Sequence, residues 1–286
     1  MLPFRRILFP VDYSEPCRAV VPYVTEAVRR YSAELTLLHA YGPEALAGSE
    51  LPLTDPGLPA EAHEFEQGRL HTFAAEMFPG QQVEAVTHEG EPGTVIHAFV
   101  QHQGTDLVML PTHGRGPVRR FLLGSVTTKV LHDVSAAVWT GTGSAIADHT
   151  PSIPYKSILC ALGEGPEAEV VLTAAVALAG SYGAQLELLH VTPPPPITAE
   201  MDLGPYLEAL IEAGNFQMRE LKGKLGVDAP HTVLTGMIAT TVRDEALRRK
   251  ADLLVTGRGD AQGTFSRLWS HLYPLVRESP CPVLSI

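Results

Sequence analysis

The sequence repeats itself, and the repeat limits the folds that are open to this chain. The pair Ile7-Leu8 recurs as Ile158-Leu159, and the run Leu37-Leu38-His39 recurs as Leu188-Leu189-His190. Residues 7 and 158 are 151 apart, and so are residues 39 and 190. Because the separation stays constant across several predicted elements, it indicates a duplicated domain.

Within each copy, short apolar runs alternate with stretches of helical periodicity. In the first copy the apolar runs predict strands at residues 6–11, 33–40, 82–88, 107–110 and 136–140. Helices are expected between them, since strands that alternate with helices form a parallel sheet with right-handed crossovers. We therefore predict an α/β fold of two tandem, open-twisted, five-stranded parallel sheets, each with helices on both faces.

The repeat also places the domain boundaries. The stretch between the copies is small, polar and interrupted by proline, which is typical of a linker. We predict an N-terminal domain at 1–142, a linker at 143–154 and a C-terminal domain at 155–286. The pair Asp106-Leu107 recurs as Asp252-Leu253 at a separation of only 146, so the second copy is shorter in its loops but keeps its order.

Composition and charge exclude several classes of function. The chain is 45% hydrophobic and 19% charged, which is typical of a globular protein. Its net charge of −11 argues against broad binding to nucleic acid or to an anionic membrane, because both require a basic surface. No apolar run is long enough to span a bilayer, and no signal peptide precedes the first strand, so we expect a cytoplasmic protein.

Cysteine and histidine give no sign of a metal centre. The three cysteines are Cys17, Cys160 and Cys281, which are far apart and form no C-x2-C pair, so buried or half-buried thiols are expected. The twelve histidines contain no H-E-x2-H spacing. We therefore predict no protein-made metal site.

The stretch 106–127 carries the strongest functional signal. A buried strand ends at Pro111, a loop with Gly114 and Gly116 follows, and helical periodicity resumes after Gly124. This order brings main-chain N–H groups and a helix N-terminus to the carboxyl end of a parallel strand, where an anion can bind. The alternative is a βα turn whose glycines serve only a tight bend.

The spacing of the glycines in this loop also resembles a known family motif. The chain shows Pro111-x2-Gly114-x9-Gly124-Ser125, which resembles the nucleotide loop of the universal stress protein family, G-x2-G-x9-G followed by serine or threonine. The likeness extends over nearly the whole chain, as two copies. Pro111 stands where the family usually has its first glycine, and proline offers no N–H.

The resemblance implies a Rossmann-like, adenine-nucleotide-hydrolase-like fold that binds ATP or a related adenine nucleotide, with Mg²⁺ carried by the phosphates. The triplet Pro10-Val11-Asp12 matches the family's contact to adenine and ribose, although the residue pattern alone favours Asp12 as a cap for the next helix; both roles can hold at once. The implied site residues are Pro10, Val11, Asp12, Ala40, Leu110, Pro111, His113, Gly114, Arg115, Gly124, Ser125, Val126 and Thr127. The resemblance also implies that the two domains pair through their last strands as a pseudo-two-fold dimer within one chain; association of two chains is left open.

The second copy departs from this pattern. It has Ala161-Leu162-Gly163 in place of the acidic triplet, and the expected glycine-serine pair falls at Trp269-Ser270. An indole at the phosphate position and Asp260 in the loop both disfavour a triphosphate. We expect the C-terminal domain to have a degenerate nucleotide loop.

Two hypotheses follow for the function. The first is a stress-response regulator that binds an adenine nucleotide in its N-terminal domain. The second is an interaction scaffold in which both sites are degenerate. We expect no enzyme beyond slow ATP hydrolysis at most, because Ser125 near His113 is the only suggestive pair and no third catalytic residue accompanies it. The stress, the partner and the choice among ATP, AMP and a cyclic nucleotide are not determined by the sequence.

Overall fold

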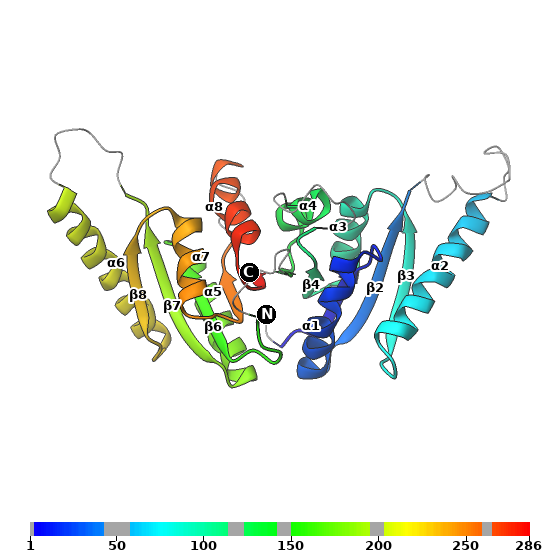
Figure 1. The fold of residues 1–286 in the computed structure, drawn as a ribbon, viewed down its shortest axis with the longest axis horizontal. Helices are drawn as coiled ribbons and strands as arrows, with labels where there is room; N and C mark the ends of the chain where they lie inside the picture. The colour runs from blue at the N-terminus through cyan, green and yellow to red at the C-terminus, as the bar shows by residue number, and fades with distance from the viewer. Residues whose placement is uncertain (1–2, 43–57, 114–122, 142–149, 195–202, 259–264) are drawn as a thin grey trace. The chain divides into compact units, whose positions relative to one another are not determined.

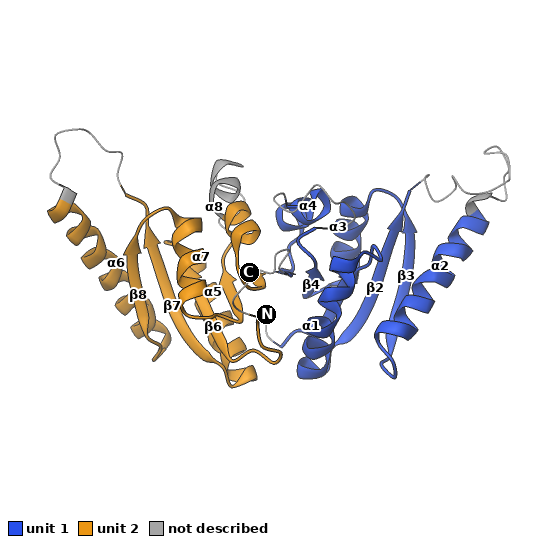
Figure 2. Ribbon diagram, in the orientation of Figure 1, with its two compact units in different colours: residues 1, 3–141 blue, residues 2, 142–286 orange. Residues whose placement is uncertain are grey.

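The computed structural model describes residues 3–42, 58–113, 123–141, 150–194, 203–258 and 265–286. The chain divides into two compact units, Pro3–Gly141 and Thr142–Ile286 (Figure 2). Most of the predicted linker at 143–154 lies outside the described residues. Each unit alternates strands with helices, and we describe each by itself.

The first unit is a parallel sheet flanked by helices (Figure 1). Its described strands are β1 (Arg6–Pro10), β2 (Glu34–Tyr41), β3 (Val83–Glu89), β4 (Leu107–Leu110) and β5 (Ala137–Thr140). Its described helices are α1 (Glu15–Tyr31), α2 (Leu58–Met77), α3 (Pro92–Gln103) and α4 (Ser125–Asp133).

The strand order in this unit is β3-β2-β1-β4-β5, and the pairs β1–β2, β1–β4, β2–β3 and β4–β5 are all parallel. All four residues of β4 are buried, as their continuous apolar run predicts for a central parallel strand. Since the crossovers from β1 to β3 and from β3 to β5 run in opposite directions, right-handed connections put α1 and α2 on one face and α3 and α4 on the other.

The second unit repeats this architecture. Its described strands are β6 (Ser157–Leu162), β7 (Gln185–Thr192), β8 (His231–Thr235), β9 (Leu253–Thr256) and β10 (Val283–Ser285). Its described helices are α5 (Glu167–Tyr182), α6 (Leu203–Leu225), α7 (Ile238–Arg248) and α8 (Phe265–Glu278). The order β8-β7-β6-β9-β10 is again parallel. The predicted tandem α/β fold is confirmed, whereas pairing of the domains through their last strands stays a prediction.

The repeated aspartate has the same structural role in both units. Asp106 Oδ2 accepts hydrogen bonds from the N–H groups of Arg5 and Arg6, at 2.7 and 2.8 Å. Asp252 makes three such bonds, to the N–H groups of Ser152, Lys156 and Ser157. Each carboxylate therefore holds the start of the first strand of its unit against the start of the fourth strand, which explains why the Asp-Leu pair recurs.

The three thiols are buried inside the two units. Cys17, Cys160 and Cys281 are free and buried, as expected. Burial raises the pKa of the Cys17 and Cys281 thiols to about 12, so neither is a thiolate at neutral pH.

Within the described part of the chain, no helix combines the length and the apolar character that crossing a membrane requires.

Glu91 joins two helices of the first unit. Its carboxylate caps α3 by accepting from the N–H groups of Gly93 and Thr94, at 2.9 and 2.8 Å, and lies 3.2 Å from the ammonium of Lys129 on α4. Partial burial raises the pKa of Glu91, but the bonds from Thr94, Gly93 and Lys129 outweigh that effect and lower it to about 2. The ionised form is therefore the one that stabilises this corner of the unit.

We expect Asp252→Ala to lower the free energy of unfolding more than Asp106→Ala does. Asp252 is only 2% exposed, so truncation leaves three N–H groups without an acceptor, at a cost on the order of 3 kcal/mol. Asp106 makes two such bonds and is half-buried. Urea unfolding combined with hydrogen exchange of peptides from β1 and β6 measures each unit separately. Equal loss in both variants would contradict this ranking.

The stabilising effect of Glu91 should disappear in acid. Because its pKa is lowered on folding, its contribution is complete above its ordinary pKa of 4.5 and is lost as the pH falls toward 2. Glu91→Gln should therefore be less stable than the parent at pH 7 and equally stable near pH 2. Glu212→Gln on the exposed face of α6 is the control, with no change at either pH. A difference that stays constant down to pH 2 would show that ionisation is not the cause.

Candidate functional site

The strand order of the first unit points to one crevice. β1 pairs with β2 on one edge and with β4 on the other, and the chain leaves β1 and β4 toward opposite sides of the sheet. Ligands of open α/β sheets bind at this kind of switch point, outside the carboxyl ends of the strands. Here the described ends of two connections meet it: residues 11–14 after β1, and residues 111–113 and 123–124 after β4.

The end of β1 is tightly held. Val11 is only 4% exposed, its N–H donates to the Leu38 carbonyl at 2.9 Å, and its carbonyl accepts from His39 Nδ1 at 2.7 Å. Val11 can therefore offer a ligand only the second lone pair of its carbonyl. Pro10 and Ala40 are half-buried nearby, and Ala40 lies two residues beyond the last pair of the β1–β2 ladder, Pro10 with Leu38.

Asp12 takes part in the turn that starts α1. Its Oδ1 accepts from the N–H and the hydroxyl of Ser14, at 3.0 and 2.6 Å, and Ser14 Oγ in turn accepts from the N–H of Cys17 at 3.3 Å. Ser14 is thus the N-cap, and Asp12 holds the cap in place. A capping role and a ligand role are compatible, because a carboxylate has about four acceptor sites.

Two hydrogen bonds close the loop after β4. The Gly124 N–H donates to the Thr112 carbonyl at 2.9 Å, and the Thr127 hydroxyl donates to the Pro111 carbonyl at 3.0 Å. The two ends of the glycine loop are thereby brought together beside the start of α4. Leu110 is buried beneath them and Pro111 is half-buried, whereas Gly114 and Arg115 lie outside the described residues.

The start of α4 supplies main-chain donors. Gly124 is the N-cap, and the N–H groups of Ser125, Val126 and Thr127 form the first turn, where no intrahelical acceptor is available. The Ser125 side chain is exposed. Thr127 is 3% exposed and its hydroxyl already donates to the Pro111 carbonyl, so its N–H is the donor that remains for a ligand.

Three buried polar atoms of Thr112 and His113, in the loop after β4, have no hydrogen-bond partner among the described residues. They are both ring nitrogens of His113 and the Thr112 hydroxyl. A Cβ built on Gly124 would be 3.6 Å from His113 Cα, so the backbone of His113 lies next to the start of α4. Buried polar atoms are normally paired, so this end of the crevice fits a polar ligand. The sequence singled out His113 but offered no signal for Thr112.

A cluster beside Asp12 was not foreseen from the sequence. The buried Glu66 carboxylate of α2 lies 3.4 Å from His39 Nε2 and accepts from Arg69 Nη1 on both oxygens, at 3.0 and 2.9 Å. The Tyr13 ring contacts both His39 and Arg69: its centroid is 4.7 Å from the His39 ring and 4.4 Å from the Arg69 guanidinium carbon. Only the repeated His39 carried any sequence signal.

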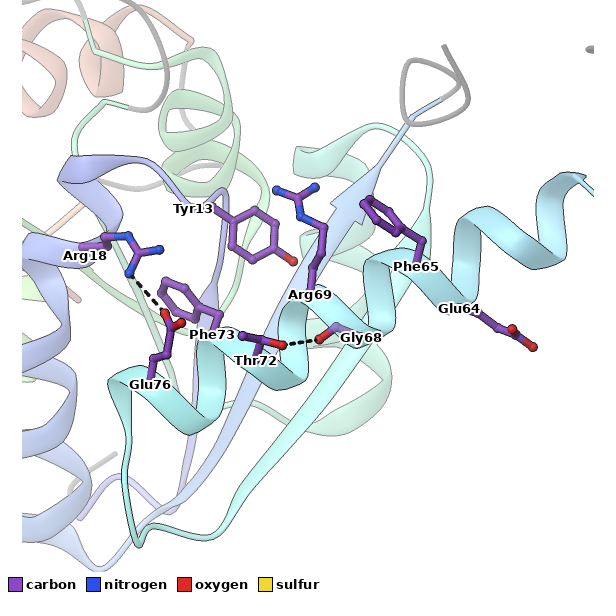
Figure 3. A pocket seen from close by; sticks show the side chains of 9 residues that line it. All are labelled: Tyr13, Arg18, Glu64, Phe65, Gly68, Arg69, Thr72, Phe73 and Glu76. Atoms are coloured by element: carbon purple, nitrogen blue, oxygen red, sulfur yellow. Dashed lines mark hydrogen bonds and ion pairs between the residues drawn. The ribbon is translucent and has the colours of Figure 1, made fainter. Parts of the chain in front are cut away.

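The outer side of this cluster opens into a cleft of about 570 Å³ between α1 and α2. Figure 3 shows Arg69 above the Tyr13 ring and Arg18 beside Phe73 and Glu76. The charged groups of Arg18 and Glu76 are 3.7 Å apart at the edge of the cleft and partly exposed, so their opposite charges balance each other. The cleft thus marks the solvent side of the cluster that flanks Asp12.

The second unit keeps part of this geometry. His190 Nδ1 donates to the Leu162 carbonyl at 2.9 Å, as His39 does to Val11, but Gly163 replaces Asp12. The pair Trp269-Ser270 lies inside α8, which begins at Phe265, whereas Gly124-Ser125 is at the start of α4. The aligned pair therefore provides no helix N-terminus, and Asp260 lies outside the described residues.

The described side chains can also be compared with the ligand sets of metal sites. Across the part of the chain that the structure describes, no three His, Cys, Asp or Glu side chains come together as a metal site would require. The crevice instead collects one carboxylate, helix N–H groups and a histidine.

Comparison with known proteins agrees with the duplication. The universal stress protein family profile matches residues 3–140 and again residues 154–286. A universal stress protein of Methanocaldococcus jannaschii is 24% identical over 143 residues, which are 45% of this chain and 88% of that protein. Another from Thermus aquaticus is 30% identical over 135 residues, 47% of this chain and 96% of that protein. Nearly a whole relative thus fits about half of this chain.

A solved structure shares the fold of this chain. The crystal structure of a universal stress protein from Archaeoglobus fulgidus covers 98% of this chain, over 95% of its own length, with a TM-score of 0.69 and 19% identity. At that identity the likeness concerns the fold. The two family matches, which together span most of the sequence, show that this chain belongs to the universal stress protein family, with two tandem domains.

Proposed function

We propose that the N-terminal unit binds ATP or a related adenine nucleotide between β1 and β4, and that the chain acts as a nucleotide-dependent regulator in a stress response. The observation that carries the proposal is that both ring nitrogens of His113 are buried and have no hydrogen-bond partner among the described residues, while the backbone of His113 lies next to the start of α4. A phosphate placed there would accept from one nitrogen and from the first N–H groups of the helix.

The adenosine end would lie against β1 and β2. The Asp12 carboxylate is suited to accept from a ribose hydroxyl or an adenine amino group. Ala40, beyond the end of the β1–β2 ladder, lines the same edge with Pro10. Because Val11 already uses its N–H, adenine contacts here depend on Asp12 more than the sequence suggests.

The phosphate end would lie against α4. The N–H groups of Ser125, Val126 and Thr127 point along the positive end of the helix dipole, and Ser125 adds an exposed hydroxyl. Pro111 supplies no N–H, so this end relies on the helix and on His113. Mg²⁺ would be carried by the phosphates of the nucleotide.

Isothermal titration of the purified protein with Mg-ATP tests the proposal. We expect saturable binding at one site per chain, and about 10-fold weaker binding in Asp12→Asn, because the loss of one charge-assisted hydrogen bond costs ~1.5 kcal/mol. Asparagine keeps the acceptor that holds Ser14, so the turn is preserved.

Gly163→Ala is the matched control, since Gly163 is the counterpart of Asp12 and a Cβ there meets no atom within 4 Å. Its affinity should equal that of the parent. No binding by the parent would overturn the nucleotide proposal and favour an interaction scaffold.

His113→Ala separates the two ends of the site. Removing the imidazole should weaken ATP binding several-fold but leave adenosine binding unchanged, because only the phosphates would contact His113. Titrations of parent and variant with ATP and with adenosine measure the two affinities. An equal loss for both ligands would place His113 at the adenosine end, contrary to the proposal.

A further inference from the structure

Asp12 sits between two residues that the same cluster anchors. On one side, the Val11 carbonyl accepts from His39 Nδ1 at 2.7 Å. On the other, the Tyr13 ring packs between the His39 ring and the Arg69 guanidinium. The orientation of the Asp12 carboxylate therefore depends on the residues that hold its neighbours.

Tyr13 needs such an anchor because of its backbone. Its φ of +63° is in the left-handed region, which residues other than glycine, asparagine and aspartate seldom adopt. Residues in such conformations persist only where the surroundings hold them, and they are concentrated at functional sites. Ring contacts to His39, to Arg69 and to Phe73 at 5.6 Å supply that hold.

Glu66 connects the members of the cluster. It is 3% exposed, and a carboxylate buried this deeply requires compensating partners. Arg69 bonds to both of its oxygens, and His39 Nε2 lies 3.4 Å from Oε2. Since α2 carries both Glu66 and Arg69, this helix is tied to the turn that holds Asp12.

The geometry favours one protonation state of His39. Its Nδ1 must carry a proton, because a carbonyl oxygen only accepts. Its Nε2 lies 3.4 Å from Glu66 Oε2, an oxygen that also accepts from Arg69, and an acceptor lone pair on Nε2 would be repelled there. We therefore expect a proton on each nitrogen, so that the Tyr13 ring contacts an imidazolium as well as the Arg69 guanidinium.

The second unit provides an internal comparison. His190 keeps the bond to its strand carbonyl, but its Nε2 has no hydrogen-bond partner among the described residues. The Glu164 carboxylate is 4.0 Å away on a side chain that is 68% exposed. Gly214 of α6 packs over the ring, where a Cβ would be 3.1 Å from His190 Cδ2. The buried carboxylate is thus present in the unit that has Asp12, whereas His190 lacks one in the unit that has Gly163.

We propose that Tyr13, His39, Glu66 and Arg69 are positioning residues that hold the Asp12 turn in its ligand-binding orientation. This role rests on the proposed nucleotide site. The cluster acts on Val11 and Tyr13, on either side of Asp12, and does not itself contact the nucleotide.

Glu66→Gln tests the role directly. The neutral amide keeps the shape of the side chain but removes the charge that faces His39 and Arg69. We expect ATP affinity to fall on the order of 10-fold, the size typical when an outer partner of a binding site is removed. Glu164→Gln, the corresponding change near His190, is the matched control and should bind as the parent does.

A double-mutant cycle with Asp12→Asn distinguishes positioning from general destabilisation. If the cluster acts through Asp12, Glu66→Gln should weaken binding much less in the Asp12→Asn background than in the parent. Full additivity of the two losses would overturn the positioning role. Absence of ATP binding by the parent would overturn the proposed function itself, so the two failures are distinguishable.

Two further measurements keep the proposal testable if Glu66→Gln folds poorly. Nitrogen NMR of the imidazoles at pH 7 should show His39 protonated on both nitrogens in the parent; a neutral His39 would overturn the proposed cluster.

The second measurement uses variants of Tyr13. Tyr13→Gly suits the left-handed φ but removes the ring, and it should weaken ATP binding, whereas Tyr13→Phe keeps the ring and should bind ATP as the parent does. Parent-like affinity in Tyr13→Gly would contradict the role of the ring.

Discussion

The position of β1 between β2 and β4 is the constraint on which the rest of the first unit depends. Its main-chain groups pair with both neighbours, and at its start the Asp106 carboxylate holds two further N–H groups. At its end the last hydrogen bond to β2 runs from the Val11 N–H to the Leu38 carbonyl, and side chains then take over: His39 donates to the Val11 carbonyl and Asp12 accepts from Ser14. The site therefore begins where the sheet can no longer supply hydrogen bonds.

The two units differ in the charged residues around the histidine of their second strand. Each unit has a histidine that donates to the carbonyl at the end of its first strand. Only beside His39 does a helix supply a buried carboxylate among the described residues, and that carboxylate requires Arg69 as a second partner. In the second unit a glycine of α6 packs over the imidazole instead. The duplicated fold thus preserves the strand contact, whereas the polar surroundings of the histidine have diverged together with the residue after the strand.

Charges in the first unit are placed where they organise helix starts and loop ends. Glu91 caps α3 and pairs with Lys129 of α4, which keeps these helices together on one face. On the opposite face, Glu66 and Arg69 of α2 hold the turn that starts α1. The crevice between β1 and β4 is consequently bordered by elements that are each fixed by a charged side chain, which suits a preorganised binding site.

The sequence by itself determined the duplication and the order of strands and helices, and it indicated a helix cap close to Asp12, because apolar periodicity, a constant separation and capping residues are local signals. It also located the two loops at the switch point. Only the tertiary structure decided that Val11 N–H and the Thr127 hydroxyl are used inside the protein, and that Thr112 and His113 have buried polar atoms without partners among the described residues. The same holds for Glu66 and Arg69, which are more than fifty residues from Asp12 in sequence. They reach its turn because the crossover from β2 to β3 lays α2 against it, a contact between distant residues that no local pattern encodes.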